Sequence, residues 1–329
     1  MTKSMSKRAR LEATFAGAET DRPAVALWRH WPIDDLWGDE LARATITFQK
    51  TYDYDFIKVT PNSNYCVAAY GAEASWRGNE EGTYQWGPRV IQTAEDWAKL
   101  KPLEPRTGLQ GEVLEANRLI GQEFGDEVPF IQTIFNPLSQ AKNLAGDRLI
   151  ADLRQHPDAV KAGLAAITES IVRFIEALKS TGAAGIFLAM QHASYDLLTE
   201  AEYGEFGRPL DLRILQATEG MWFRLIHLHG TNVMFDMAAD YPAELINWHD
   251  TETPPTLAEA MTRTDKALCG GLRQWETMLR GTPESIQAEA DAALVATGGR
   301  RFVLGTGCVT PITAPTANLV AARRAVEPR

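Results

Sequence analysis

Eight short apolar runs, each separated from the next by a longer helix-like run, constrain the fold of this chain more than any other feature. The apolar runs are nearly continuous or rich in β-branched residues, as is typical of strands buried on both faces of a sheet. They cover residues 24–30, 56–61, 128–135, 183–190, 223–230, 243–250, 266–272 and 301–308. Helix-like stretches lie at 39–52, 108–125, 158–180, 199–206 with its continuation, 232–242, 256–265, 283–298 and 313–326.

This alternation predicts a parallel sheet, because consecutive parallel strands need a crossover connection, usually a helix. Eight strand–helix units fill the 329 residues with little left over. We therefore predict a single (β/α)8 barrel domain over residues 1–329, with an open, doubly wound sheet as the alternative. Residues 63–110 are rich in glycine, tryptophan and tyrosine and are interpreted as an insertion after the second strand.

The charge balance limits the kinds of partner. The net charge is −10 and the isoelectric point is about 5.2, which argues against nucleic acid or an anionic membrane, because both bind through lysine and arginine. No run of 18 apolar residues occurs, and the basic start MTKSMSKRARLEATF is not followed by a signal-peptide pattern. A cytoplasmic protein is expected. The chain has three cysteines, and this small, odd number argues against a disulfide framework.

Polar residues gather at the predicted strand ends. In a (β/α)8 barrel, the active site lies at the carboxyl ends of the strands. Five of the six histidines end or directly follow a predicted strand, namely His30, His192, His227, His229 and His249. The same positions hold Asn62, Asn136, Gln191, Asp250 and Cys308. Histidines used only as polar filler in a core would not gather at one face, so this pattern predicts a functional site.

His227 and His229 share one face of their strand, because side chains alternate across a strand with a period of two. Two imidazoles on one face suit Zn²⁺, which takes four nitrogen, sulfur or oxygen ligands. Cys308, at the end of the eighth strand, supplies a candidate thiolate. The predicted metal ligands are His227, His229 and Cys308. The alternative is that the two histidines hydrogen-bond a substrate or neighbouring groups.

Other residues are assigned to the same rim. His192, His249, Asp250 and Arg29 are candidate catalytic groups, and Asn62, Asn136, Gln191 and Trp31 are candidate substrate contacts. Arg29 could clamp a carboxylate or pair with an acid such as Asp34 or Asp35. Trp31 belongs to a group of loop tryptophans that could cover an apolar pocket or simply pack against one another.

The order of these features resembles the uroporphyrinogen decarboxylase superfamily. The resemblance is carried by LWRHW at 27–31, DFIKVTP at 55–61, FNPLSQA at 135–141, the segment 183–206, HLHGTN at 227–232 and LGTGCVTPITAPTANL at 304–319. It implies a (β/α)8 barrel and often a homodimer. The superfamily also contains zinc methyltransferases, which move methyl groups from a corrinoid protein to a thiol such as coenzyme M.

Three positions depart from the decarboxylase pattern. Arg29 matches the first arginine of the Arg-Gln-x-Gly-Arg signature, but Ile33 replaces the second. Asn62 stands where decarboxylases carry an aspartate that binds the pyrrole nitrogens, and Thr306 replaces the histidine of a Leu-Gly-His-Gly turn. A substrate with many carboxylates also fits an acidic protein poorly. The departures argue against porphyrinogen decarboxylation.

The methyltransferase branch is matched more closely, with one exception. His227, Gly230 and Cys308 match its His-x-Cys-Gly and Thr-Gly-Cys motifs, which hold the zinc ligands, but His229 replaces the first cysteine. A site with one thiolate leaves Zn²⁺ with a net charge of +1, which lowers the pKa of a bound group but makes a bound thiolate less nucleophilic. No Asp-x-His-x-x-Gly corrinoid signature occurs. Cobalamin, if used, is expected on a partner protein.

These observations support three hypotheses. The first is a zinc methyltransferase or demethylase component that acts on a small methylated compound or on a methyl-corrinoid, with His192, His249 or Asp250 as acid–base groups or as partners that orient a ligand. The second is a metal-free lyase of the decarboxylase type, with Arg29 as the anchor of a carboxylate substrate. The third is a binding protein without catalytic activity, which the concentration of histidines at one rim disfavours.

Overall fold

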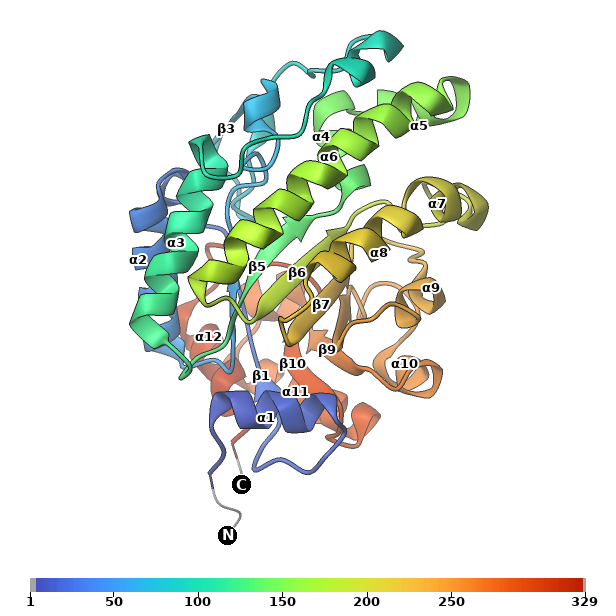
Figure 1. Cartoon of the computed structure of the whole chain (residues 1–329). Helices are drawn as coiled ribbons and strands as arrows, with labels where there is room; N and C mark the ends of the chain where they lie inside the picture. The colour runs from blue at the N-terminus through green and yellow to red at the C-terminus, as the bar shows by residue number, and fades with distance from the viewer. Residues whose placement is uncertain (1–3, 328–329) are drawn as a thin grey trace.

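The computed structural model describes residues 4–327 and shows one curled sheet of eight parallel strands with helices around it (Figure 1). The strand order is β1-β10-β9-β8-β7-β6-β5-β2. The strands are β1 (Ala24–Val25), β2 (Ile57–Val59), β5 (Phe130–Phe135), β6 (Gly185–Met190), β7 (Phe223–Leu228), β8 (Leu245–Trp248), β9 (Ala267–Leu272) and β10 (Phe302–Thr306). All eight predicted strands are confirmed, and the open doubly wound alternative is wrong, because that fold would not keep this order.

A buried aspartate joins the two outer strands, β1 and β2. The backbone N–H of Asp55 donates to the carbonyl of Val25 at 2.9 Å, and the N–H of Val25 donates to Asp55 Oδ2 at 2.8 Å. Arg10 and Arg22 each form an ion pair with this carboxylate at 2.7 Å. Arg10 comes from α1 (Lys7–Phe15), which lies at the end of the molecule that carries both termini (Figure 1). A side chain therefore completes the seam where the strands are too short for a full ladder.

The helices cover the outside of the sheet. All eight predicted helical stretches contain a helix, namely α2 (Gly38–Tyr52), α3 (Gly108–Phe124), α6 (Pro157–Leu178), α7 (Glu200–Phe206), α9 (Phe235–Ala239), α10 (Leu257–Arg263), α11 (Pro283–Thr297) and α12 (Thr316–Arg324). α8 (Arg208–Ala217) is the continuation of the stretch that begins at 199, and the structure adds α1, α4 (Pro137–Ala145), α5 (Arg148–Gln155) and a π-helical turn, η5 (Gln274–Leu279). The start of α4 carries a recognisable signal, because Asn136 caps it and proline occupies its first turn.

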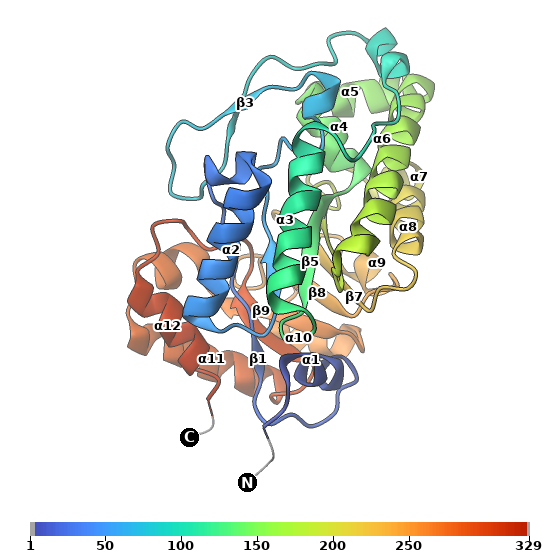
Figure 2. The ribbon, with the colours of Figure 1, turned by 60° about the vertical axis from the view of Figure 1, so that its left-hand side comes forward.

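The segment 63–110 lies at the opposite end of the molecule from the termini (Figure 2). It contains a short antiparallel pair, β3 (Ala74–Ser75) and β4 (Gln85–Trp86), between two 3-10 turns. Trp97 anchors the segment, because its side chain is fully buried and its Nε1 donates to Asp152 Oδ2 at 2.8 Å. This segment contributes part of the wall of the cavity described below.

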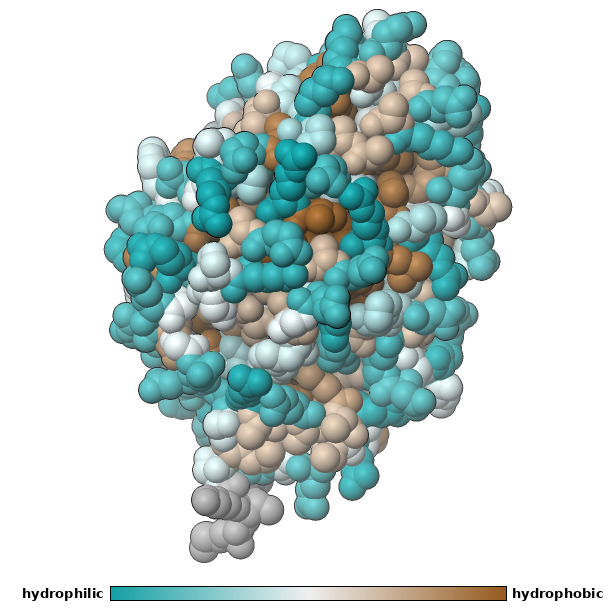
Figure 3. Space-filling model, in the orientation of Figure 1, coloured by the Kyte–Doolittle hydropathy of each residue, from teal (hydrophilic) through white to brown (hydrophobic). Residues whose placement is uncertain are grey.

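The face in Figure 3 is mainly hydrophilic, with small apolar areas scattered across it. Within residues 4–327, no helix combines the length and the apolar composition that crossing a membrane requires.

Candidate metal centre

A cavity of about 260 Å³ opens within the barrel, lined by side chains from the strands, the loops after them and the 63–110 segment. The lining residues include His227, His229, Cys308, Lys58 and Phe187. This agrees with the rule that (β/α)8 barrels place their sites at the carboxyl ends of strands.

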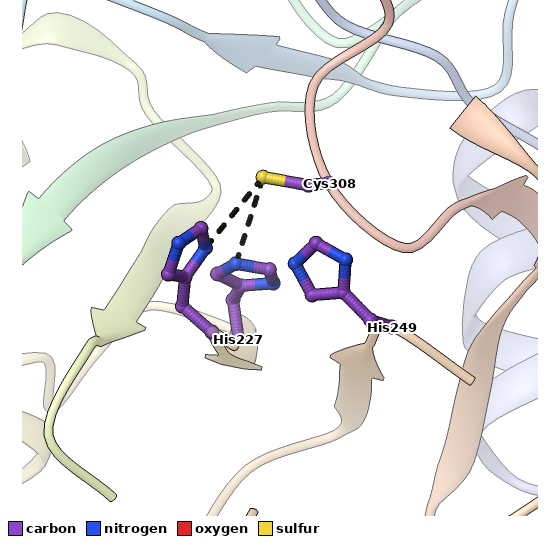
Figure 4. A group of neighbouring side chains, drawn as sticks. His227, His249 and Cys308 are labelled. Carbon is purple, nitrogen blue, oxygen red and sulfur yellow. Dashed lines mark hydrogen bonds between the residues drawn. The ribbon is translucent and has the colours of Figure 1, made fainter. Parts of the chain in front are cut away.

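Three imidazoles and one thiol converge beside this cavity. One nitrogen each of His227, His229 and His249 and the Sγ of Cys308 all lie within 4.8 Å of one another. Cys308 Sγ is 3.9 Å from His227 Nε2 and 3.9 Å from His229 Nδ1. Figure 4 shows the side chains of His227, His249 and Cys308 directed toward a common centre. The structure thus brings together the three residues predicted as ligands and adds His249.

The strand register accounts for the first two of these groups. His227 lies in β7, directly opposite Asn247 of β8, and His229 follows two residues later on the same face. Gly230 then turns the chain with a φ of 90°, a conformation that residues with a side chain rarely adopt. The imidazole of His229 therefore reaches the same centre as that of His227.

Close packing of two loops brings in the other two groups. His249 follows β8, and Cys308 follows β10, which is separated from β8 by β9. Gly307 lies against the backbone of His249, where a Cβ would come within 2.7 Å of the His249 Cα. Only glycine lets the loop that carries Cys308 approach His249 this closely.

Asn247 fixes the orientation of His227. Its Nδ2 donates to the carbonyls of Cys269 and Thr306 at 2.9 and 3.0 Å, so its Oδ1 faces His227 Nδ1 at 2.7 Å. We infer from this network that Nδ1 carries the proton and that the lone pair of Nε2 faces Cys308. A hydrogen bond of this kind to the remote nitrogen is typical of a histidine that binds a metal. Phe187 stacks on the His227 ring at 5.1 Å between centroids.

The site holds its histidines neutral. Burial lowers the pKa of His227 well below its usual value, and the nearby His229 and His249 lower it further. Burial lowers the pKa of His229 to about 4, and it also lowers the pKa of His249. Burial raises the pKa of the Cys308 thiol to about 11. Neutral imidazole is the form that binds metal ions, whereas the thiol must lose its proton on binding.

His249 has an unsatisfied nitrogen, which fits a metal ligand. Its Nδ1 lies 3.5 Å from Glu252 Oε2, while its buried Nε2 has no hydrogen-bond partner among residues 4–327. The sequence predicted His249 on the rim as an acid–base or orienting group. The adjacency of β7 and β8 in the sheet is what joins it to His227 and His229.

The other predicted catalytic residues lie apart from the cluster. Asp250 turns away from its neighbour His249 and accepts the N–H of Gly271 at 3.0 Å, in a buried position that raises its pKa to about 7. His192 is buried, with its pKa lowered to about 4 by burial, and is absent from the cavity wall. Their assignment to catalysis stays a prediction without geometric support.

Arg29 and Trp31 lie together outside the cavity. Arg29 Nη1 donates to the carbonyl of Ile312 at 2.9 Å, and the guanidinium lies 4.4 Å from the centroid of the Trp31 ring. Trp28 and His30 line the cavity instead. Alternation along an extended chain explains this, since the residue between two inward side chains points outward.

Of the predicted polar contacts, only Gln191 lines the cavity. Asn62 donates to the carbonyl of Asp35 at 2.9 Å and accepts from the N–H of Asn64 at 3.0 Å. Asn136 accepts from the N–H of Ser139 at 3.0 Å. The two asparagines therefore support loop and helix geometry at the strand ends.

Sequence reasoning missed most of the residues that line the cavity, among them Lys58, Glu81 and Tyr84. Lys58 lies within β2, a position that reads as part of a strand, and its charge was the available signal. Glu81 and Tyr84 belong to the 63–110 segment, whose path over the barrel no local pattern predicts.

Comparisons with known proteins agree with the resemblance to methyltransferases. The chain is 26% identical to the methylcobamide:CoM methyltransferase MtbA of Methanosarcina mazei over 88% of this chain and 84% of that protein. It is also 26% identical to MtbA of Methanosarcina acetivorans over 70% and 67% of the two chains. These similarities agree with the prediction that the chain is nearer to the methyltransferases than to the decarboxylases of the superfamily.

Solved structures support the fold. A methyltransferase from Methanosarcina mazei superposes with a TM-score of 0.83 at 18% identity, over 98% of each chain. A B12-independent methionine synthase from Shewanella sp. W3-18-1 gives 0.60 at 13% identity, over 92% of this chain and 95% of that one. The family model described as uroporphyrinogen decarboxylase (URO-D) matches residues 38–328. The chain belongs to the uroporphyrinogen decarboxylase family.

Proposed function

We propose that this protein is a zinc-dependent methyltransferase, in which His227, His229, His249 and Cys308 hold the metal. The observation that carries the proposal is the convergence of these three imidazoles and one thiol beside a cavity at the mouth of the barrel. The similarity to methyltransferases at 26% identity supports the reaction class.

The donor set fits Zn²⁺. Tetrahedral bonds of ordinary length to nitrogen and sulfur separate the two donor atoms by about 3.6 Å. The sulfur of Cys308 lies 3.9 Å from a nitrogen of each of two histidines, so only a small contraction is needed. The neutral imidazoles, the Asn247 hydrogen bond and the unsatisfied Nε2 of His249 all suit a metal ligand set.

Zn²⁺ bound by one thiolate and neutral imidazoles would carry a net charge of +1 and would lower the pKa of a thiol, alcohol or water that binds to it. In this chain Asn247 holds His227 in the binding tautomer, and Phe187 packs on its other side. Gln191 lines the cavity, where its amide would orient the small molecule. We assign the acceptor or methylated substrate to this cavity.

His249 is the ligand we propose to yield its place to substrate. Catalytic zinc sites keep a position open, and four protein donors would fill a tetrahedral site. His227 is held by Asn247 inside the barrel, whereas the partner of His249 is Glu252, a partly exposed loop residue at 3.5 Å. The weaker restraint on His249 favours its displacement.

The methyl group is proposed to come from a corrinoid carried by a partner protein. The support is the name of the relatives, methylcobamide:CoM methyltransferase, together with the lack of a corrinoid-binding signature in this sequence. Transfer in the opposite direction, from a small methylated compound to the corrinoid, would use the same site.

Metal analysis tests the metal centre. Protein purified without chelators is expected to contain about one zinc per chain, whereas His227→Gln and Cys308→Ala contain little. His192→Gln is the matched control, because His192 is a buried histidine outside the cluster and should leave the zinc content unchanged. Little zinc in the wild type, or equal zinc in His227→Gln, would falsify the metal site.

Methyl transfer tests the reaction. Zinc-loaded protein is incubated with methylcobalamin and a panel of small thiols, and the loss of the cobalt–carbon bond is followed by absorbance. We expect a rate that depends on zinc, on Cys308 and on the thiol. A rate no faster than that of metal-free protein with every thiol would contradict this direction of transfer.

The metal-free lyase has less support. Its proposed anchor, Arg29, donates to a backbone carbonyl and stacks on Trp31 outside the cavity. No observation within residues 4–327 favours it over methyl transfer.

A further inference from the structure

A carboxylate from the 63–110 segment lies in the wall of the cavity beside the candidate metal centre. Glu81 is half-buried and is the one acidic residue in the described part of that wall. Burial raises the pKa of the Cys308 thiol most, and the negative charge of Glu81 raises it further, more than any other charged group. A charge has such an effect only at short range, so the Glu81 carboxylate lies close to the thiol.

A short turn, residues 79–83, fixes the position of Glu81. The Oδ1 of Asn79 accepts the N–H groups of Gly82 and Thr83 at 2.7 and 3.1 Å. The Nδ2 of the same side chain donates to the carbonyl of Thr83 at 2.7 Å. One asparagine therefore closes the turn around Glu81 through both ends of its amide.

The turn is fastened to the loop that carries Cys308. The carbonyl of Glu80 accepts the N–H of Ile312, which follows Cys308 in the loop after β10, at 2.8 Å. Gly82 has a φ of 88°, and a Cβ at this position would come within 2.7 Å of the side chains of both Ile312 and His30. Only glycine permits this approach. The packing of two loops, distant in sequence, thus brings a carboxylate to the thiol.

The donor set of this chain gives a nearby negative charge a role. Zn²⁺ bound by Cys308 and neutral imidazoles carries a net charge of +1, whereas the two thiolates of the methyltransferase motif would leave none. A positive site lowers the pKa of a bound thiol and, with it, the nucleophilicity of the thiolate. Burial raises the pKa of Glu81, but a neighbouring positive site favours its ionised form.

We propose that the Glu81 carboxylate offsets the positive charge of the zinc site and so keeps a bound thiol reactive toward a methyl group. Glu81 is not one of the four groups whose donor atoms converge within 4.8 Å, so it acts through its charge and not as a ligand. In the transfer, the sulfur–carbon bond forms as the cobalt–carbon bond breaks, the electron pair of that bond stays on cobalt, and the thiol proton passes to the buffer. The inference rests on the proposed function, from which it takes the zinc site and the thiol.

Two other charged side chains act on the Cys308 thiol, both less strongly than Glu81. Lys58 lowers its pKa and Glu252 raises it. Glu252 is 43% exposed and lies beside the Nδ1 of His249, outside the cavity wall. Among these groups, Glu81 is therefore the negative charge best placed to act on a molecule in the cavity.

The ionisation of a bound thiol tests the charge directly. Co²⁺ replaces zinc, 2-mercaptoethanol is added because it carries no charge of its own, and the absorption of the thiolate–Co²⁺ contact is followed against pH. We expect Glu81→Gln to move the midpoint about one pH unit lower, because removal of a nearby negative charge favours the thiolate. Glu81→Asp keeps the charge and should stay near the wild-type midpoint.

Glu80→Gln is the matched control. Glu80 is exposed, lies in the same turn and is absent from the cavity wall, so its substitution changes the net charge equally without changing the charge in the cavity. Its midpoint should equal that of the wild type. Metal content and thermal unfolding are measured for each variant, since a half-buried glutamate replaced by its amide should leave the fold intact.

The rate of methyl transfer gives a second measurement. At a pH well above the midpoint, where the thiol is fully ionised in every variant, zinc-loaded Glu81→Gln should transfer methyl from methylcobalamin to 2-mercaptoethanol about threefold more slowly than the wild type. Glu80→Gln should keep the wild-type rate.

The two proposals fail in different ways. An unchanged midpoint in Glu81→Gln, an equal shift in Glu80→Gln, or a slower rate without a shift of the midpoint would overturn the role of Glu81 and leave the metal-bound thiol in place. Absence of any thiol-dependent absorption in the wild type would overturn the proposed function together with this inference.

Discussion

Two buried polar clusters lie among the helices and strand ends of this barrel, and they differ in how their hydrogen bonds are satisfied. In one, the carboxylate of Asp211 accepts hydrogen bonds from Tyr203 and Tyr241 at 2.6 and 3.1 Å and from Asn136 at 2.9 Å. In the other, Cys308 Sγ lies 3.9 Å from His227 Nε2 and 3.9 Å from His229 Nδ1. The Nε2 of His249 has no hydrogen-bond partner within residues 4–327.

The difference distinguishes buried polar groups that stabilise the fold from buried polar groups that are available to bind a ligand. The Asp211 cluster is complete, so it stabilises the helices α7 and α8 against the strand ends and leaves no group for a ligand. The metal cluster is incomplete without a further atom at its centre, because buried polar groups are normally paired. An unsatisfied cluster that faces a cavity is therefore the better indicator of a site.

The largest effect is expected from a substitution that disrupts the Asp211 cluster. Asp211→Ala removes the common acceptor of two hydroxyls and one amide, all buried, and should lower the free energy of unfolding by roughly 3–5 kcal/mol. Urea denaturation measures it, and the zinc content per folded chain should stay near that of the wild type. His229→Ala is the counterpart: it should remove zinc and change the stability of metal-free protein far less. The reverse pattern would contradict the comparison.

A smaller effect sharpens the link between Asn247 and the metal centre. Asn247→Leu removes the acceptor that orients His227, and zinc affinity should fall about 10–100-fold. Competition with a chelator of known affinity measures the loss. Asn247→Asp keeps an acceptor for His227 Nδ1 and should lose less affinity than Asn247→Leu; an equal loss in both would show that the hydrogen bond is not the cause.

The smallest expected effect is the dependence of zinc affinity on pH. Burial raises the pKa of the Cys308 thiol to about 11, so at pH 7–8 this group is protonated before the metal binds and must release its proton. The pKa of His229 is about 4, so it releases none. Zinc affinity should thus rise about tenfold per pH unit in this window, and Cys308→Ala should lose the dependence. Calorimetry in buffers of different ionisation enthalpy measures the number of protons released on zinc binding. Release of nearly no protons by the wild type would refute the predicted ionisation of Cys308.

Much of the fold was predictable because its signals are local. Near-continuous apolar runs marked all eight strands, and amphipathic stretches marked eight of the helices. The helices α4 and α5 were missed, although Asn136 and Pro137 give a start signal for α4. The path of segment 63–110 could not be predicted, since it depends on the burial of Trp97 against Asp152, far away in the sequence.

The site was predicted in part for the same reason. The alternation of side chains placed His227 and His229 together, and the position of Cys308 at the end of the eighth strand added the thiol. The same alternation, applied to the first strand, would have directed Arg29 away from the cavity, where the structure finds it. Asn62 and Asn136 occupy strand ends and yet satisfy the backbone, a distinction that only their partners reveal.

The sequence by itself determined the barrel, the branch of the family and the pair of histidines on one face of a strand, because periodicity and motif spacing are properties of neighbouring residues. The tertiary structure decided which polar groups meet. His249 joins the cluster through the adjacency of β7 and β8, and Cys308 through the close approach of Gly307 to His249. Glu81 reaches the same cavity through the close approach of Gly82 to Ile312. Such contacts join residues far apart in the chain, and their geometry follows from how the strands and loops pack.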